Sequence, residues 1–165
     1  MDVFHEASSP NHLGSEPIAD PQSFLHLLGP SDDPNMLGRV GNYEVVGVIG
    51  HGGMGVVFKA LDSTLDRFVA IKMMLPQLSA NGTARQRFLR EAKAAAAVVD
   101  DHVLPIFGVD QWQGTPYLVM QYSSGRTLDR RIEDEGALKV QEILRIALQT
   151  AKGLAAAHAQ TLQPR

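Results

Sequence analysis

Four glycines within six positions separate two stretches rich in β-branched residues, and this arrangement constrains the fold more than any other feature of the chain. Residues 43–49 and 56–61 both have the composition of β-strands. The glycines therefore lie in a hairpin and not at the start of a helix. Because glycine has no Cβ, such a hairpin can lay its backbone N–H groups close over an anion such as phosphate. The four glycines are Gly50, Gly52, Gly53 and Gly55.

A third apolar stretch, residues 68–74, also predicts a strand, and one cation lies inside it. This cation is Lys72, between Ile71 and Met73. A lysine is rarely buried unless a partner pairs with it. We therefore expect an acidic group close to Lys72.

The expected partner lies on an alanine-rich helix, which is predicted from Thr83 as its N-cap to Val99. Glu91 lies on the apolar side of this helix, and an unpaired buried carboxylate costs several kcal/mol. We therefore expect Glu91 to point inward and to pair with Lys72, although an ordinary solvated helix charge is the alternative. The apolar stripe at helical spacing consists of Phe88, Ala92, Ala95 and Val99.

The glycine spacing Gly-x-Gly-x-x-Gly by itself fits three kinds of nucleotide-binding fold. A Walker A loop would continue with Gly-Lys-Ser/Thr, and a dinucleotide fingerprint would continue into a helix with an acidic residue about 20 positions on. Neither continuation is present, because a strand is predicted next and residues 68–72 contain no acid. A protein kinase combines Gly-x-Gly-x-x-Gly-x-Val with a downstream Val-Ala-Ile-Lys. Both halves occur here, at Gly50, Gly52, Gly55, Val57 and Val69–Lys72.

The chain therefore resembles the eukaryotic-like Ser/Thr protein kinases of bacteria. The resemblance implies an α+β fold, with a small lobe at residues 43–122 that has a five-stranded antiparallel sheet and one helix. Residues 123–165 would form the hinge and the first two helices of the large lobe. The remaining strands and helices are expected at residues 106–109, 116–122, 128–135 and 140–160.

The resemblance also implies a site for ATP. The glycine hairpin would cover the phosphates, Lys72 would bind the α- and β-phosphates, and Glu91 would hold Lys72 in place. Lys72 and Glu91 are thus the catalytic residues that this chain would supply. The residues expected to bind ATP are Ile49, Gly50, His51, Gly52, Gly53, Met54, Gly55, Val57, Ala70, Lys72, Met120, Gln121 and Ser123.

Adenine would lie in an apolar slot beside the hinge. Met120 falls at the position that limits access to this slot, and the backbone of Gln121 and Ser123 would bind the adenine edge. Family members often have Glu where Gln121 stands, but a contact through the backbone makes this departure a small one. The side chains expected to enclose adenine are Ile49, Val57 and Ala70.

In the family, the catalytic base and the magnesium ligands belong to His-Arg-Asp and Asp-Phe-Gly loops. The sequence reaches Arg165 before either loop, so we expect no Mg²⁺ ligands and little phosphoryl transfer by this chain alone. Two hypotheses stay open. The chain is either a shortened Ser/Thr kinase, whose intact form phosphorylates a protein substrate, or a module that binds ATP or another kinase chain through an apolar face of the helix at 140–160.

Residues 1–42 differ from the rest in composition, with five of the nine prolines and six acids against one base. This composition predicts disorder, although the apolar patch Ser23–Leu28 can dock on the domain. The net charge of −3 argues against a nucleic-acid partner. The chain has no cysteine, which fits a cytoplasmic protein, and no apolar run of about 18 residues that would predict a membrane segment.

Overall fold

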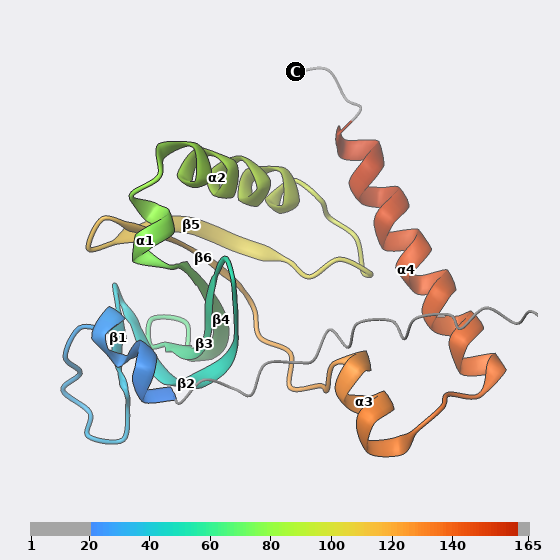
Figure 1. Cartoon of the computed structure of the whole chain (residues 1–165), viewed down its shortest axis with the longest axis horizontal. Coiled ribbons are helices and arrows are strands. Elements are labelled where there is room, and N and C mark those ends of the chain that lie inside the picture. The colour runs from blue at the N-terminus through green and yellow to red at the C-terminus, as the bar shows by residue number, and fades with distance from the viewer. Residues whose placement is uncertain (1–20, 162–165) are drawn as a thin grey trace, which may run out of the picture.

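A curled antiparallel sheet of six strands forms the larger part of the molecule (Figure 1). The computed structural model describes residues 21–161. The strands follow the spatial order β1-β2-β3-β4-β6-β5, which confirms the predicted α+β small lobe with one strand more than expected. The strands are β1 (Gly38–Val40), β2 (Tyr43–Gly52), β3 (Gly55–Asp62), β4 (Arg67–Met74), β5 (Ile106–Trp112) and β6 (Thr115–Gln121).

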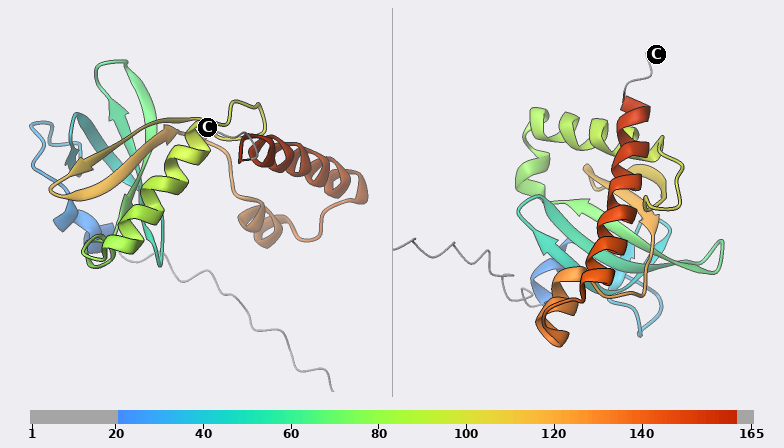
Figure 2. Two further views of the ribbon diagram at one scale, coloured as in Figure 1. Left: turned by 90° about the horizontal axis from the view of Figure 1, so that it is seen from above. Right: turned by 90° about the vertical axis from the view of Figure 1, so that its right-hand side faces the viewer.

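The helices lie along one face of the sheet and at one side of it (Figure 2). Helix α2 runs along the sheet, whereas α3 and α4 form a separate pair beyond the end of β6. No helix among residues 21–161 has the length and apolar character that a bilayer crossing requires. The helices are α1 (Pro76–Ser79), α2 (Gly82–Ala96), α3 (Leu128–Glu135) and α4 (Val140–Thr161).

Strand β4 separates two hydrophobic cores, because its successive side chains point to opposite faces of the sheet. One core includes Phe58 and Tyr117, and the other joins Met74 to Phe88 of α2. By this alternation Lys72 lies on the α2 face of the sheet. The residues of β4 in the first core, each at most 1% exposed, are Val69, Ile71 and Met73.

The two ends of α2 differ from the prediction. Asn81, and not Thr83, is the N-cap, and its side chain accepts the Thr83 backbone N–H at 3.0 Å. Because the helix ends at Ala96, the helical spacing does not continue to the next apolar residues. Val98 is therefore the buried residue, at 7% exposure, while Val99 is 94% exposed.

The disorder expected for residues 1–42 does not extend over residues 21–42. A 3-10 helix, η1 (Pro21–Leu27), packs on the face of the sheet opposite α2, and Leu27 is only 6% exposed there. Gly29 exchanges two backbone hydrogen bonds of 2.9 Å with Arg39 of β1. The apolar patch Ser23–Leu28 therefore docks on the domain, as its composition suggested, while residues 1–20 lie outside the described part of the chain.

Helices α3 and α4 occupy the positions predicted from sequence. Thr127 caps α3 by accepting the Arg130 backbone N–H at 3.2 Å, and Gly136 ends the helix with a φ of 78°. Helix α4 approaches the loop after α2 at Gly153, where a Cβ would lie 2.9 Å from the carbonyl oxygen of His102. This close approach requires glycine and is one contact between α4 and the sheet part of the molecule.

Candidate nucleotide-binding site

The glycine-rich segment forms the predicted hairpin, with Gly52 at the end of β2 paired with Gly55 at the start of β3. Gly55 is needed for packing, because a Cβ there would collide with the carbonyl oxygen of Met73 on β4. In contrast, a Cβ at Gly50, Gly52 or Gly53 would meet no atom within 4 Å. None of these three has a positive φ either. The fold itself therefore does not explain why they are glycine, and the space beside their backbone is open.

Lys72 stands in a row of residues on the α2 face of the sheet. Its register partners are Val57 on β3 and Leu118 on β6. The neighbouring row contains Ala70, which is 3% exposed, and its partner Met120. Because directly opposed residues of antiparallel strands point to the same face, the sheet brings together four predicted site residues, Val57, Ala70, Lys72 and Met120.

Glu91 does not take the inward position expected from the sequence. Its carboxylate oxygen lies 2.7 Å from Nε of Arg87, one turn earlier on α2, and its side chain is 53% exposed. None of the ion pairs of the described residues joins Glu91 to Lys72. The expectation of a Lys72–Glu91 pair is wrong for this structure, because the carboxylate of Glu91 binds Arg87, four residues earlier on the same helix.

The electrostatics of Glu91 follow from this geometry. The hydrogen bond from Arg87 lowers the pKa of the Glu91 carboxyl below its ordinary value, and Lys72 lowers it further by the smallest contribution. Lys72 therefore lies within electrostatic reach of Glu91 without contacting it. Glu91 on α2 and Lys72 on β4 are thus held apart in this structure.

A small hollow of about 220 Å³ lies between the tip of the glycine hairpin and α2. Gly53 and Met54 border it from the hairpin, and Arg87 and Glu91 border it from the helix. The Arg87–Glu91 pair therefore lies beside the hairpin, at the phosphate end of the expected nucleotide position. Among residues 21–161, no group of three or more His, Asp or Glu side chains is placed to hold a metal ion.

The segment predicted as the hinge begins where β6 ends. The Gln121 backbone N–H donates to the carbonyl oxygen of Pro105 at 3.0 Å, and the side chains of Gln121 and Ser123 are exposed. Tyr122, between them, packs its ring against Phe68 of β4, with the ring centroids 6.3 Å apart. Ile49 of β2, another predicted site residue, is 46% exposed.

The sequence analysis missed one residue of this region, Lys59 of β3. Its ammonium lies 4.2 Å from the ring centroid of Phe68 and 4.8 Å from that of Tyr122. The one signal available was its position two residues after Val57, which places both side chains on the same face of the strand. Nothing in the sequence alone joined Lys59 to rings on two other segments.

Comparisons with known proteins identify the class of protein that this fold and site define. The family model of the protein kinase domain matches residues 43–163, and the chain belongs to that family. Its relatives are Ser/Thr kinases of bacteria. The probable serine/threonine-protein kinase pknA2 of Bifidobacterium longum is 39% identical over 122 residues, a match that covers 72% of this chain and 16% of that protein.

Two further relatives give the same result. Serine/threonine-protein kinase PrkC of Bacillus subtilis is 36% identical over 118 residues, covering 72% of this chain and 18% of that protein. The crystal structure of the Mycobacterium tuberculosis PknI kinase domain has a TM-score of 0.65 and 27% sequence identity, covering 74% of this chain and 51% of that chain. The chain thus spans less than a fifth of these curated relatives and about half of a solved kinase domain.

Proposed function

We propose that the glycine hairpin, β4 and the segment 121–123 border a cleft that binds ATP. We further propose that this chain supplies the nucleotide-binding part of a Ser/Thr protein kinase, which transfers the γ-phosphate to a hydroxyl of a protein substrate. The observation that carries the proposal is the open space at Gly50, Gly52 and Gly53. A side chain at these positions would fill the space that phosphate oxygens need, and its absence lets backbone N–H groups approach them.

Each residue of the cleft has a role in this proposal. Lys72 donates to the α- and β-phosphates, and Glu91 orients Lys72 once it leaves Arg87. Val57 and Ala70 enclose adenine from the two neighbouring strands. Met120 closes the slot at its inner end.

The hinge backbone and the metal complete the proposed site. The carbonyl of Gln121 and the N–H of Ser123 bind the adenine edge. Magnesium, when bound with the nucleotide, neutralises phosphate charge, and its family ligands are not among the residues of this chain. The residues of this chain therefore bind and orient ATP, and the phosphoryl transfer itself also requires the part of the domain that carries the catalytic loops.

The test of the proposal is a binding measurement on the whole chain. A charge-assisted hydrogen bond contributes about 1.5–3 kcal/mol, so Lys72→Met is expected to weaken ATP binding by roughly tenfold or more. Lys93→Met is the matched control, because Lys93 is an exposed lysine of α2 outside the cleft. Isothermal calorimetry that gives equal ATP affinity for wild type and Lys72→Met would contradict the assignment of Lys72.

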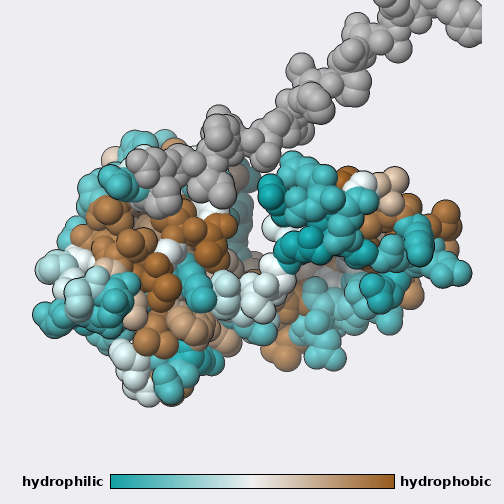
Figure 3. All heavy atoms as spheres, turned by 90° about the horizontal axis from the view of Figure 1, so that it is seen from below, coloured by the Kyte–Doolittle hydropathy of each residue, from teal (hydrophilic) through white to brown (hydrophobic). Residues whose placement is uncertain are grey.

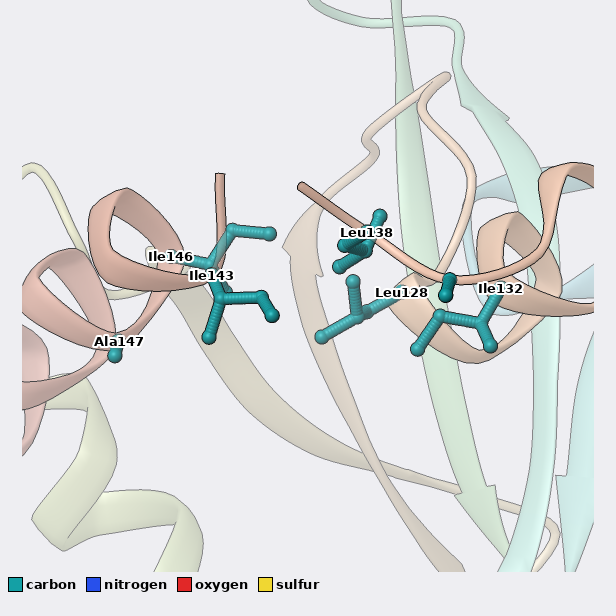
Figure 4. Close-up of a pocket in the computed structure, with 7 residues that line it drawn as sticks. Leu128, Ile132, Leu138, Ile143, Ile146 and Ala147 are labelled. Carbon is teal, nitrogen blue, oxygen red and sulfur yellow. The ribbon is translucent and has the colours of Figure 1, made fainter. Parts of the chain in front are cut away.

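An apolar groove between α3 and α4 favours a second function, the binding of another kinase chain (Figure 4). The groove has a volume of about 350 Å³, and its side chains come from both helices and the loop that joins them. Exposed apolar surfaces of this kind often mark interaction sites. Sedimentation of the chain alone and in mixture with a full-length Ser/Thr kinase would detect such binding. The lining residues are Leu128, Ile132, Ala137, Leu138, Ile143, Ile146 and Ala147.

A further inference from the structure

Three side chains from three separate segments meet beside the proposed adenine slot. Lys59 comes from β3, Phe68 from β4, and Tyr122 from the residue that follows β6. The Lys59 ammonium lies over both rings, at 4.2 Å and 4.8 Å from their centroids. The two rings meet edge to face, with an interplanar angle of 63°. A cation over two aromatic faces is attracted to both of them.

The position of this cluster follows from the sheet register. Lys59 pairs with Ala70 across β3 and β4, and it lies two residues after Val57. Phe68 lies two residues before Ala70, so it shares the same face of β4. The cluster therefore lies on the same face of β3 and β4 as Val57 and Ala70, directly beside them along the two strands. Val57 and Ala70 are the residues that enclose adenine in the proposed site.

Tyr122 links the cluster to the hinge. β6 ends at Gln121, and residues 122–127 contain no helix or strand. The adenine contacts proposed above use backbone groups of Gln121 and Ser123, directly on either side of Tyr122. A side chain that holds Tyr122 against β3 and β4 therefore also sets the distance between those backbone groups and the adenine slot.

We propose that Lys59 is a positioning residue for the nucleotide site, which fixes the hinge against the sheet by lying over the rings of both Phe68 and Tyr122. This inference rests on the proposed function, since it assigns a role within the same cleft. Lys59 contacts the rings and not the phosphates. Removing the Lys59 ammonium therefore weakens the binding of every ligand that carries adenine, whether or not the ligand carries phosphates.

The choice of ligands separates this role from a direct charge contact. Lys59→Met is expected to weaken the binding of ATP and of adenosine by the same factor. This factor is roughly two- to fivefold, the range that an exposed cation–π contact implies. Lys72→Met is expected to weaken the binding of ATP far more than the binding of adenosine. NMR titration of the whole chain with each ligand gives both affinities on one sample.

Three further variants make the test specific. Lys59→Arg keeps a cation over the rings and should retain wild-type affinity. Phe68→Leu removes one ring without changing any charge and should act in the same direction as Lys59→Met. Lys93→Met, on the exposed side of α2, should change neither affinity.

Hydrogen exchange of the unliganded chain tests the hinge without any nucleotide. Lys59→Met should speed exchange of the hydrogen-bonded backbone amides of Gln121 and Gly125 by roughly two- to fivefold. Unchanged exchange there, or a loss of affinity for ATP alone, would overturn the positioning role. Equal loss in Lys59→Arg and Lys59→Met would overturn it as well. A wild-type chain that binds neither ligand would instead refute the proposed function and the nucleotide part of this inference, while the exchange result still decides whether Lys59 anchors the hinge.

Discussion

Two kinds of glycine occur in one hairpin, and they differ in what a methyl group would meet. A Cβ at Gly55 would collide with the backbone of β4, whereas a Cβ at Gly52 would extend into open space. The same substitution therefore tests packing at one position and ligand approach at the other. This contrast ties the proposed phosphate cradle to individual residues.

The pair of variants Gly55→Ala and Gly52→Ala should separate folding from binding. Gly55→Ala is expected to lower the free energy of unfolding by about 1–3 kcal/mol, the usual cost of forcing extra volume into a packed site. Gly52→Ala should leave stability almost unchanged and weaken ATP binding. Urea denaturation and calorimetry measure the two effects. Loss of stability in both variants, with no selective loss of binding in Gly52→Ala, would remove the argument for a phosphate cradle.

The Arg87–Glu91 pair makes a second prediction at the residue scale. Removing the guanidinium in Arg87→Ala should raise the pKa of Glu91 toward its ordinary value, because the hydrogen bond from Arg87 is the main cause of its depression. A depressed carboxyl pKa favours folding above the pKa of the unfolded chain, and this contribution is lost as the pH falls through the folded pKa. The contribution is small, because both side chains are more than half exposed.

NMR titration of the Glu91 carboxyl measures this change. Arg90→Ala is the matched comparison, since Arg90 acts on Glu91 through charge alone and should raise its pKa less. Arg87→Ala should also strengthen ATP binding slightly, because Glu91 becomes available to Lys72. A Glu91 pKa that is the same with and without Arg87 would contradict the observed pairing.

At the scale of elements, residues 21–40 are part of the sheet domain. Helix η1 supplies Leu27 to the core opposite α2, and Phe24 of η1 places its ring 5.7 Å from that of His51 in the glycine hairpin. This segment therefore packs behind the loop that is proposed to cover the phosphates. The family match begins at residue 43, so this packing is a feature of the chain outside the matched region.

Truncating each of two leucines of η1 in turn tests whether this helix packs on the sheet. Leu27→Ala should lower the free energy of unfolding by about 2–5 kcal/mol, as buried leucines do when truncated. Leu25→Ala should change it little, because Leu25 is 36% exposed and Leu27 only 6%. Chemical denaturation gives both values. Equal and negligible effects would mean that residues 21–28 do not pack on the sheet in solution.

The strands and helices were largely predictable from sequence, because hydrophobic periodicity and glycine placement act locally. The docking of residues 21–28 depends on contacts between distant segments, whereas the Asn81 cap and the Arg87–Glu91 pair are local features that hydrophobic periodicity does not resolve. The acidic, proline-rich composition of residues 1–42 gave no sign that Leu27 and Val40 are buried. Periodicity placed Glu91 on the apolar side of α2, yet it contains no information on whether Arg87 or Lys72 is nearer.

The same limit applies to the candidate site. The glycines, Val57, Ala70 and Lys72 belong to motifs within one continuous stretch of sequence. The register of β3 and β4 places the last three on one face of the sheet. The roles of individual site residues stay predictions until binding is measured. Lys59 escaped notice because its partners, Phe68 and Tyr122, become neighbours only when three segments assemble.

At the scale of the whole molecule, the α3–α4 pair lies beside the sheet part (Figure 2). The two parts are joined through the segment 122–127 and also meet where Gly153 of α4 approaches His102. Hydrophobic residues reach the surface of both parts (Figure 3). Several apolar side chains of α4 are about half exposed, including Ile143 at 49%, Leu148 at 59% and Leu154 at 54%. Exposed apolar surfaces of this kind often mark interaction sites or cause self-association.

Polar substitution of this surface should increase the solubility of the isolated chain and reduce its self-association. Ile143→Asn combined with Leu154→Asn is expected to raise soluble yield and reduce self-association, because less apolar area is exposed to other molecules. Gln149→Asn, at an exposed polar position of the same helix, is the control. Sedimentation velocity and soluble yield report the result. An unchanged association state would show that this surface does not drive it.

The two-sided burial of β4 has a consequence for how the protein can vary. Along residues 69–73 the side chains alternate between the core behind the sheet and the opposite face, where Ala70 and Lys72 belong to the proposed nucleotide site. Substitutions in this strand should therefore alternate in kind, one residue affecting heat tolerance and the next affecting ligand occupancy. A lineage, or an engineer, can adjust the one property while leaving the other nearly constant, by choosing odd or even positions of a single strand.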